Sequence, residues 1–270
     1  MTSKTVPSGS MAHRLSVMGL LVTLGIVYGD IGTSPLYVMR AIIGATPVIT
    51  TDYIIGAVSC IIWTLTIQTT LKYVVLALRA DNKGEGGILA LYALVRKHGR
   101  GWLYLLAIIG ASTLVADGVI TPSITVLSAI EGLRAYEPST PVIPIAIAIL
   151  TVLFFIQQYG TSAIGKLFGP LMLLWFSMLG ILGLTHVGDS WMILKAFNPW
   201  YAIRLLTTSP EWFLILGAVF LCTTGAEALY SDLGHCGKEN IRVSWACVKT
   251  MLICNYLGQG AWIISHADQL

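Results

Sequence analysis

Long apolar runs separated by short polar segments dominate this sequence, and they restrict it to few kinds of fold. A helix needs about 20 apolar residues to cross the hydrocarbon core of a bilayer. Seven runs approach or exceed that length: Leu15 to Ala45, Tyr53 to Leu78, Trp102 to Leu133, Val142 to Gln158, Leu167 to Val187, Trp212 to Tyr230 and Val243 to Ser265. Only 11% of the residues are charged, against about 25% in soluble domains. The sequence therefore predicts an all-α integral membrane protein with about seven transmembrane helices.

Lysine and arginine residues are distributed unequally between the two sides of this predicted bundle. With a cytoplasmic N-terminus, that side receives ten of them: Lys4, Arg14, Arg79, Lys83, Arg96, Lys97, Arg100, Lys166, Lys238 and Arg242. The other side receives four, Arg40, Arg134, Lys195 and Arg204, while Lys72 and Lys249 fall inside spans. The positive-inside rule then predicts a multi-pass protein of the inner (cytoplasmic) cell membrane with its N-terminus in the cytoplasm. This bias accounts for the net charge of +3, so no nucleic-acid partner is expected.

The first run contains the segment GIVYGDIGTSPLY, in which helix-breaking residues surround a carboxylate. Gly29, Gly32 and Pro35 each weaken or interrupt helical hydrogen bonding. Backbone groups freed in this way must face protein or a hydrated cavity, because lipid cannot bond them. Asp30 adds a charge that costs about 2.5 to 3.5 kcal/mol at the bilayer centre. A kinked helix with Asp30 bonded to a neighbouring hydroxyl is one interpretation, and we favour a broken helix that faces a cavity.

The third run, LVADGVITPSITVLSAIEGL, carries oxygen-bearing side chains at helical spacing. Its polar residues Asp117, Thr121, Thr125 and Ser128 fall on one helical face, and Glu131 lies close to that face. Pro122 is expected to disturb the backbone beside this stripe. Threonine and serine in membrane helices often bond only to their own backbone, but the carboxylates at both ends favour a transport pathway.

The sixth run combines hydroxyls, a helix breaker and a carboxylate in the segment FLCTTGAEALYSDLGHCGKEN. Thr223, Thr224, Gly225 and Glu227 occur within about one helical turn. Transporters built from inverted repeats have interrupted helices at corresponding positions of the two repeats. With five helices in each repeat, the interrupted pair is the first and sixth spans, as the sequence predicts here.

Four segments closely resemble signatures of one known family, the bacterial KUP/HAK/KT potassium uptake permeases. These segments are GIVYGDIGTSPLYV, DNKGEGGILALYAL, DGVITPSITVLSAIEGL and TGAEALYSDLGHCG. The resemblance implies a LeuT-like inverted-repeat fold of the amino acid-polyamine-organocation (APC) superfamily, with helices 1 and 6 broken. It divides residues 1–270, a single transmembrane domain, into a first five-helix repeat at about 15–187 and the start of a second at about 212–265. It also implies potassium uptake, with proton symport as the expected coupling.

The resemblance assigns roles to individual residues of this sequence. It implies potassium binding by Asp30, Tyr37, Asp117, Thr121, Thr125, Thr224 and Glu227. Proton coupling is expected at Glu131, Glu227 and Asp30. The expected partners are the potassium ion, protons and the lipid bilayer, with no other cofactor. A homodimer is a further expectation.

Other functions remain open at this stage. Members of the family carry further spans and a soluble C-terminal region, so this chain is expected to be an N-terminal part without them. It then represents either a transporter part or a non-transporting membrane fragment or subunit. An organic-substrate symporter of the same superfamily is another alternative, although Asp30 disfavours an amino acid carboxylate at that position. No catalytic or zinc spacing is evident, so an enzyme is not expected.

Overall fold

A computed structural model describes residues 15–46, 49–98, 101–157 and 162–267 of the chain. Within these ranges the chain is helical apart from turns and one isolated bridge between Asn82 and Glu85. The predicted all-α class is therefore confirmed for this part of the chain.

Each of the seven predicted runs is helical. The first consists of α1 (Val17–Val27), α2 (Gly29–Thr33), the 3₁₀ turn η1 (Ser34–Leu36) and α3 (Val38–Ile43). The second consists of α4 (Thr51–Thr64), the π-helix η2 (Leu65–Leu76) and η3 (Ala77–Arg79), followed by α5 (Ile88–Val95) and η4 (Arg96–His98). The third to fifth correspond to α6 (Trp102–Glu131) with η5 (Gly132–Ala135), α7 (Val142–Gln157) and α8 (Ser162–Val187).

The remaining elements belong to the last two runs and the segment that precedes them. That segment holds η6 (Trp191–Phe197) and α9 (Pro199–Thr208). The sixth run consists of α10 (Trp212–Phe220), η7 (Leu221–Thr223) and α11 (Ala228–Ser231), and it is followed by α12 (Leu233–Cys236). The seventh is α13 (Lys238–Ser265).

By length and composition, four helices of the described ranges could cross a membrane, or five if one bent pair counts as a span. The apolar part of α7 is shorter than these, covering Val142–Phe155. Helix α13 is long enough, but Lys249, Asn255 and Gln259 make its central part less apolar. The predicted total of seven spans therefore stays a prediction.

The first span is broken, as the sequence predicts. Helix α1 and the following segment Gly29–Leu36 meet at an angle of 70°. Tyr28 lies at the break with φ −106° and ψ 14°, outside the helical region. Its hydroxyl donates to the Ile241 carbonyl oxygen (2.9 Å), and its ring stacks on Trp245 of α13. Helix α13 thus holds the break in place.

The sixth span is interrupted at the predicted position as well. Its α-helix ends at Phe220 and resumes at Ala228, and Thr224 between them has an extended ψ of 130°. Gly225 adopts a φ of +82°, which side chains other than glycine rarely tolerate. A Cβ atom at Gly225 would lie 2.5 Å from the Cβ of Asp30. The two interrupted helices therefore meet at this glycine.

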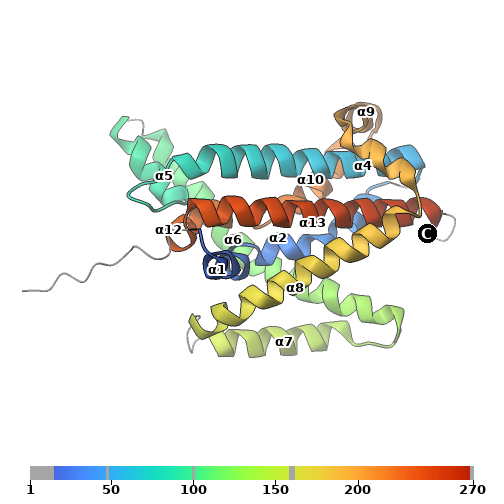
Figure 1. Ribbon diagram of the computed structural model, residues 1–270, viewed down its shortest axis with the longest axis horizontal. Helices are drawn as coiled ribbons and strands as arrows, with labels where there is room; N and C mark the ends of the chain where they lie inside the picture. Colours follow the sequence, from blue (N-terminus) through green and yellow to red (C-terminus); the bar gives the residue numbers. More distant parts are fainter. Residues whose placement is uncertain (1–14, 47–48, 99–100, 158–161, 268–270) are drawn as a thin grey trace, which may run out of the picture.

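The close packing of α13 against α8 depends on glycines, which have no side chain at the contact. A Cβ atom at Gly183 would lie 2.3 Å from the Cys254 carbonyl oxygen, and one at Gly258 would lie 2.3 Å from the Gly183 carbonyl oxygen. Small residues allow membrane helices to approach with their backbones nearly in contact. Helix α13 also contacts α1 and α4, so it occupies a central place in the bundle (Figure 1).

One end of the bundle is closed by the turn at 80–87, which connects η3 to α5. The Lys238 ammonium bonds to the Asp81 carboxylate (2.5 Å), and the Tyr230 hydroxyl donates to the Ala80 carbonyl oxygen (2.5 Å). A Cβ atom at Gly86 would lie 1.8 Å from the Tyr230 carbonyl oxygen. Figure 1 shows α5 and α12 at this end and α9 at the other.

Helix α6 is continuous from Trp102 to Glu131, with Pro122 inside it. A proline inside a helix removes one hydrogen bond and the flanking turns keep theirs, so the expected disturbance at Pro122 stays a prediction. Only 6% of the apolar window in Trp102–Ala135 is buried. Outward-facing apolar side chains of this kind suit contact with lipid.

We expect Gly183→Ala to destabilise the protein by about 1 to 3 kcal/mol, because the added methyl group meets rigid backbone of α13. Thermal unfolding in detergent measures this. The control is Gly217→Ala in α10, where nothing lies within 4 Å of the added carbon. It is expected to leave stability unchanged or raise it by up to about 1 kcal/mol. Equal melting temperatures for the two variants would contradict the close packing.

The turn at 80–87 is expected to loosen in acid. The hydrogen bond from Lys238, followed by the bond from the Gly84 N–H, holds the pKa of Asp81 below its ordinary value. A carboxyl whose pKa is lower in the folded state stabilises that state above its unfolded pKa, and this contribution is lost as pH falls through the folded pKa. The protection factors of the amides in this turn, which are exchange rates corrected for the intrinsic rate at each pH, should therefore fall on acidification. Asp81→Asn should show low protection factors at neutral pH already, and they should change little with pH.

Candidate ion-binding site

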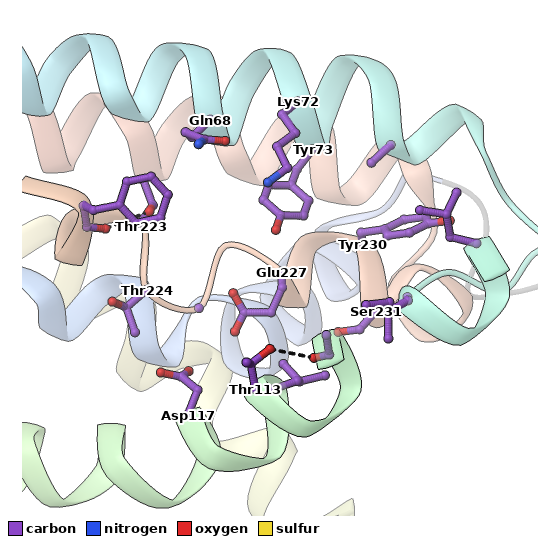
Figure 2. A pocket seen from close by; sticks show the side chains of 18 residues that line it. Gln68, Lys72, Tyr73, Thr113, Asp117, Thr223, Thr224, Glu227, Tyr230 and Ser231 are labelled. Atoms are coloured by element: carbon purple, nitrogen blue, oxygen red, sulfur yellow. Dashed lines mark hydrogen bonds between the residues drawn. The ribbon is translucent and has the colours of Figure 1, made fainter. Parts of the chain in front are cut away.

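A cavity of about 640 Å³ lies beside the break of the sixth span. Its walls are the π-helix η2, the start of α5, the first half of α6 and the segment from Phe220 to Ser231 (Figure 2). The polar side chains that line it are Gln68, Lys72, Tyr73, Thr113, Asp117, Thr223, Thr224, Glu227, Tyr230 and Ser231. Such a combination is rare in a membrane interior and indicates a functional site.

The interrupted sixth span supplies one wall. Glu227 points into the cavity from the residue before α11 (Figure 2). The hydroxyls of Thr223 and Thr224 donate to the carbonyl oxygens of Phe220 and Leu221, each at 2.8 Å. A hydroxyl oxygen has two lone pairs, so the oxygens of these two donating hydroxyls keep the capacity to bind a cation.

Helix α6 supplies the opposite wall. Asp117 lines the cavity, and its carboxylate accepts a hydrogen bond from the Thr121 hydroxyl one turn further along (2.9 Å). Thr121 is buried. Thr125, another turn along, lies 3.3 Å from Thr33 of the first span, hydroxyl oxygen to hydroxyl oxygen. The predicted polar face of this helix is therefore turned toward the other broken helix.

At the break of the first span, polar groups next to Gly225 form a series of hydrogen bonds. The Asp30 carbonyl oxygen accepts bonds from the hydroxyls of Thr33 (2.9 Å) and Ser34 (3.4 Å). The Ser34 hydroxyl also lies 3.3 Å from the Tyr37 hydroxyl and 3.2 Å from the Leu221 carbonyl oxygen. Tyr37 in turn lies close enough to Thr224 for the two side chains to interact. These contacts join the breaks of the first and sixth spans.

Three carboxylates from three different segments come near one another here. Asp30, Asp117 and Glu227 are close enough for their charges to interact. Only the last two line the cavity, while the first packs on Gly225 beside it. Three negative charges close to one another repel one another. The arrangement therefore favours a bound cation, bound protons, or both.

Glu131 lies apart from the other predicted residues. It forms an ion pair with Arg40 of α3 and is not among the residues that line the cavity. Its charge is thus already balanced. The seven remaining positions lie at the two breaks or along the facing side of α6, and they are Asp30, Tyr37, Asp117, Thr121, Thr125, Thr224 and Glu227.

Sequence reasoning missed three residues of η2 that line the cavity. Gln68, Lys72 and Tyr73 share a wall (Figure 2), because a π-helix bonds each residue to the fifth along and so brings positions 68, 72 and 73 to one side. The sequence did offer one signal for this wall, because Gln68 and Lys72 are polar side chains four residues apart inside an apolar run. It offered no signal that this run forms a π-helix.

The donor set suits a monovalent cation better than a transition metal. Within the described ranges, no three His, Cys, Asp or Glu side chains are placed to share one metal ion. Alkali cations are bound instead by several hydroxyl and carbonyl oxygens with few charges, and both kinds of oxygen occur at these breaks.

Comparison with known proteins places the chain in a family. Residues 17–270 match the family described as K+ potassium transporter integral membrane domain. Similar curated proteins are each called probable potassium transport system protein Kup. One from Flavobacterium psychrophilum is 59% identical over 254 residues, which are 94% of this chain and 39% of that protein. One from Latilactobacillus sakei is 52% identical over an alignment of 270 positions that covers 95% of this chain and 39% of that protein.

The chain thus spans about 39% of the length of these curated relatives. No solved structure matches it, so the LeuT-like arrangement of helices stays a prediction. Its apolar helices and the matched family description together make it part of a multi-pass membrane protein. The chain belongs to the K+ potassium transporter family.

Proposed function

We propose that this chain takes part in potassium uptake across the cell membrane and that the uptake is coupled to protons. The relatives named as potassium transport proteins support the cation, and they are not enzymes. The observation that carries the proposal is the meeting of two interrupted helices at Gly225 and Asp30, beside a cavity with two further carboxylates.

Potassium binding follows from the oxygen atoms gathered at these breaks. The proposed ligands are Asp30, Tyr37, Asp117, Thr121, Thr125, Thr224 and Glu227, which lie at the two breaks and along the facing side of α6. Neutral oxygens replace the hydration shell of the ion, and carboxylates balance its charge. The same carboxylates repel an anionic group, which disfavours an amino acid or similar organic substrate.

One potassium ion balances one negative charge, and the site has more than one carboxylate. We propose that the remaining carboxylates carry the coupled proton. Asp30 and Glu227 have no ion-pair partner within 4 Å in the described part of the chain. They can therefore alternate between binding the cation and carrying a proton. Glu131 could relay a proton only after leaving Arg40, so we place it later in the pathway.

The inverted-repeat fold and the orientation belong to the same proposal. The first and sixth spans are the interrupted pair, which suits repeats at about 15–187 and 212–265. The orientation follows from which residues share one end of the bundle. The basic residue Lys238 pairs with Asp81 beside α12, and at the same end Ser16, at the start of α1, bonds to Asn240. Lys4, Arg14 and Arg100 lie outside the described residues. We assign this end to the cytoplasm.

Substitution of the carboxylates tests the site. A chimera is required, in which this chain is joined to the part of the Flavobacterium psychrophilum relative that it does not match. In cells without their own potassium uptake, Asp30→Asn and Glu227→Gln should each lower rubidium uptake by roughly tenfold or more, since a lost charged ligand costs about 1.5 to 3 kcal/mol. Asp189→Asn and Glu239→Gln, outside the cavity, are the matched controls. Undiminished uptake in both site variants would reject the assignment.

Proteoliposomes test the coupling. With equal rubidium on both sides and a permeant anion holding the membrane potential at zero, an acidic exterior should drive net rubidium accumulation by the chimera. A protonophore should abolish it, because protons then equilibrate without carrying the cation. Accumulation that ignores both the pH gradient and the protonophore would exclude proton symport while leaving potassium transport intact.

A further inference from the structure

Lys72 is the one basic residue among those that line the cavity. It lies on η2 within the span Thr51–Arg79. Figure 2 shows its ammonium group reaching down from η2 beside the ring of Tyr73, into the space above Glu227, whose carboxylate turns sideways toward Thr224 and Asp117. A lysine inside a span is costly in lipid, so its position in a polar cavity needs an explanation.

The ammonium group has no carboxylate within ion-pair distance in the described part of the chain. Its closest recorded contact is the ring of Tyr73, 4.8 Å from Nζ to the ring centroid. Glu227 lies further away but still within electrostatic range. Other basic residues, among them Arg40 and Lys238, form ion pairs. Lys72 is thus a positive charge close to a carboxylate without being bonded to it.

The carboxylates of the site suggest a role for the Lys72 ammonium group. Asp30, Asp117 and Glu227 interact with one another, and a monovalent ion balances only one of them. When that ion leaves, the repulsion among the carboxylates increases. The lysine ammonium is a compact charge on a flexible four-carbon stem, so it can approach a carboxylate and withdraw again.

We propose that Lys72 is a tethered competitor of the transported cation. It moves toward Glu227 when the site is empty and withdraws toward Tyr73 when a potassium ion is bound. The role depends on the proposed function, because it requires that a monovalent cation bind here. It lowers the affinity of the site and so assists release. The opposing interpretation is a lysine that merely extends toward the membrane surface, which leaves cation binding unaffected.

Equilibrium binding of rubidium to the purified chimera in detergent tests the role. Lys72→Met keeps the length of the side chain and removes the charge, and it should lower the dissociation constant by roughly five- to tenfold, within the range of couplings between sites. Lys72→Arg should stay close to the unsubstituted protein. Lys249→Met, a matched change on α13 outside the cavity, should also leave binding unchanged.

A double substitution identifies the partner. In a Glu227→Gln background, which weakens but need not abolish binding, Lys72→Met should change the dissociation constant much less than it does alone, because coupled residues are not additive. Thermal unfolding of each variant shows whether it is folded. Unchanged or weaker binding in a folded Lys72→Met protein overturns the role of Lys72 alone. Absence of rubidium binding in the unsubstituted chimera overturns the proposed function, and this role with it.

Discussion

The approach of Gly225 to Asp30 is the contact on which the rest of the site depends. No side chain fits between the two interrupted helices there, since a single added carbon would lie 2.5 Å from Asp30. The φ of +82° at the same glycine turns the chain between η7 and α11. Because the two breaks touch, the oxygen atoms that each exposes belong to one region, and Glu227 and Asp117 face each other across the adjoining cavity.

Interrupted helices need support in a bilayer, where each unbonded backbone group costs several kcal/mol. Helix α13 supplies much of it. Its Gln259 amide donates to the Pro35 carbonyl oxygen at the first break (3.1 Å), and its Trp245 indole donates to the hydroxyl of Thr70 on η2 (3.0 Å). Its polar residues, which make it less apolar than the other spans, thus serve the scaffold. Glycine contacts with α8 hold it close enough to do so.

Much of the fold could be predicted because its signals are local. Gly29 and Pro35 predict the first break, and Gly225 predicts the second. The spacing of Asp117 and Thr121 predicts that they lie one turn apart on a helix. Pro122 lies inside an α6 that stays continuous, whereas the two broken segments combine several helix breakers and are bonded by neighbouring helices.

Apolar length and helix breakers act within a few residues, so the apolar helices and the places where two of them are interrupted could be predicted from the sequence alone. Which charges are balanced depends on the tertiary structure. Arg40 neutralises Glu131 across 91 positions of sequence, while Lys72, which lines the cavity, has no ion-pair partner among the described residues. Such pairings depend on how helices cross and how closely their backbones approach, and no local pattern of residues encodes those distances.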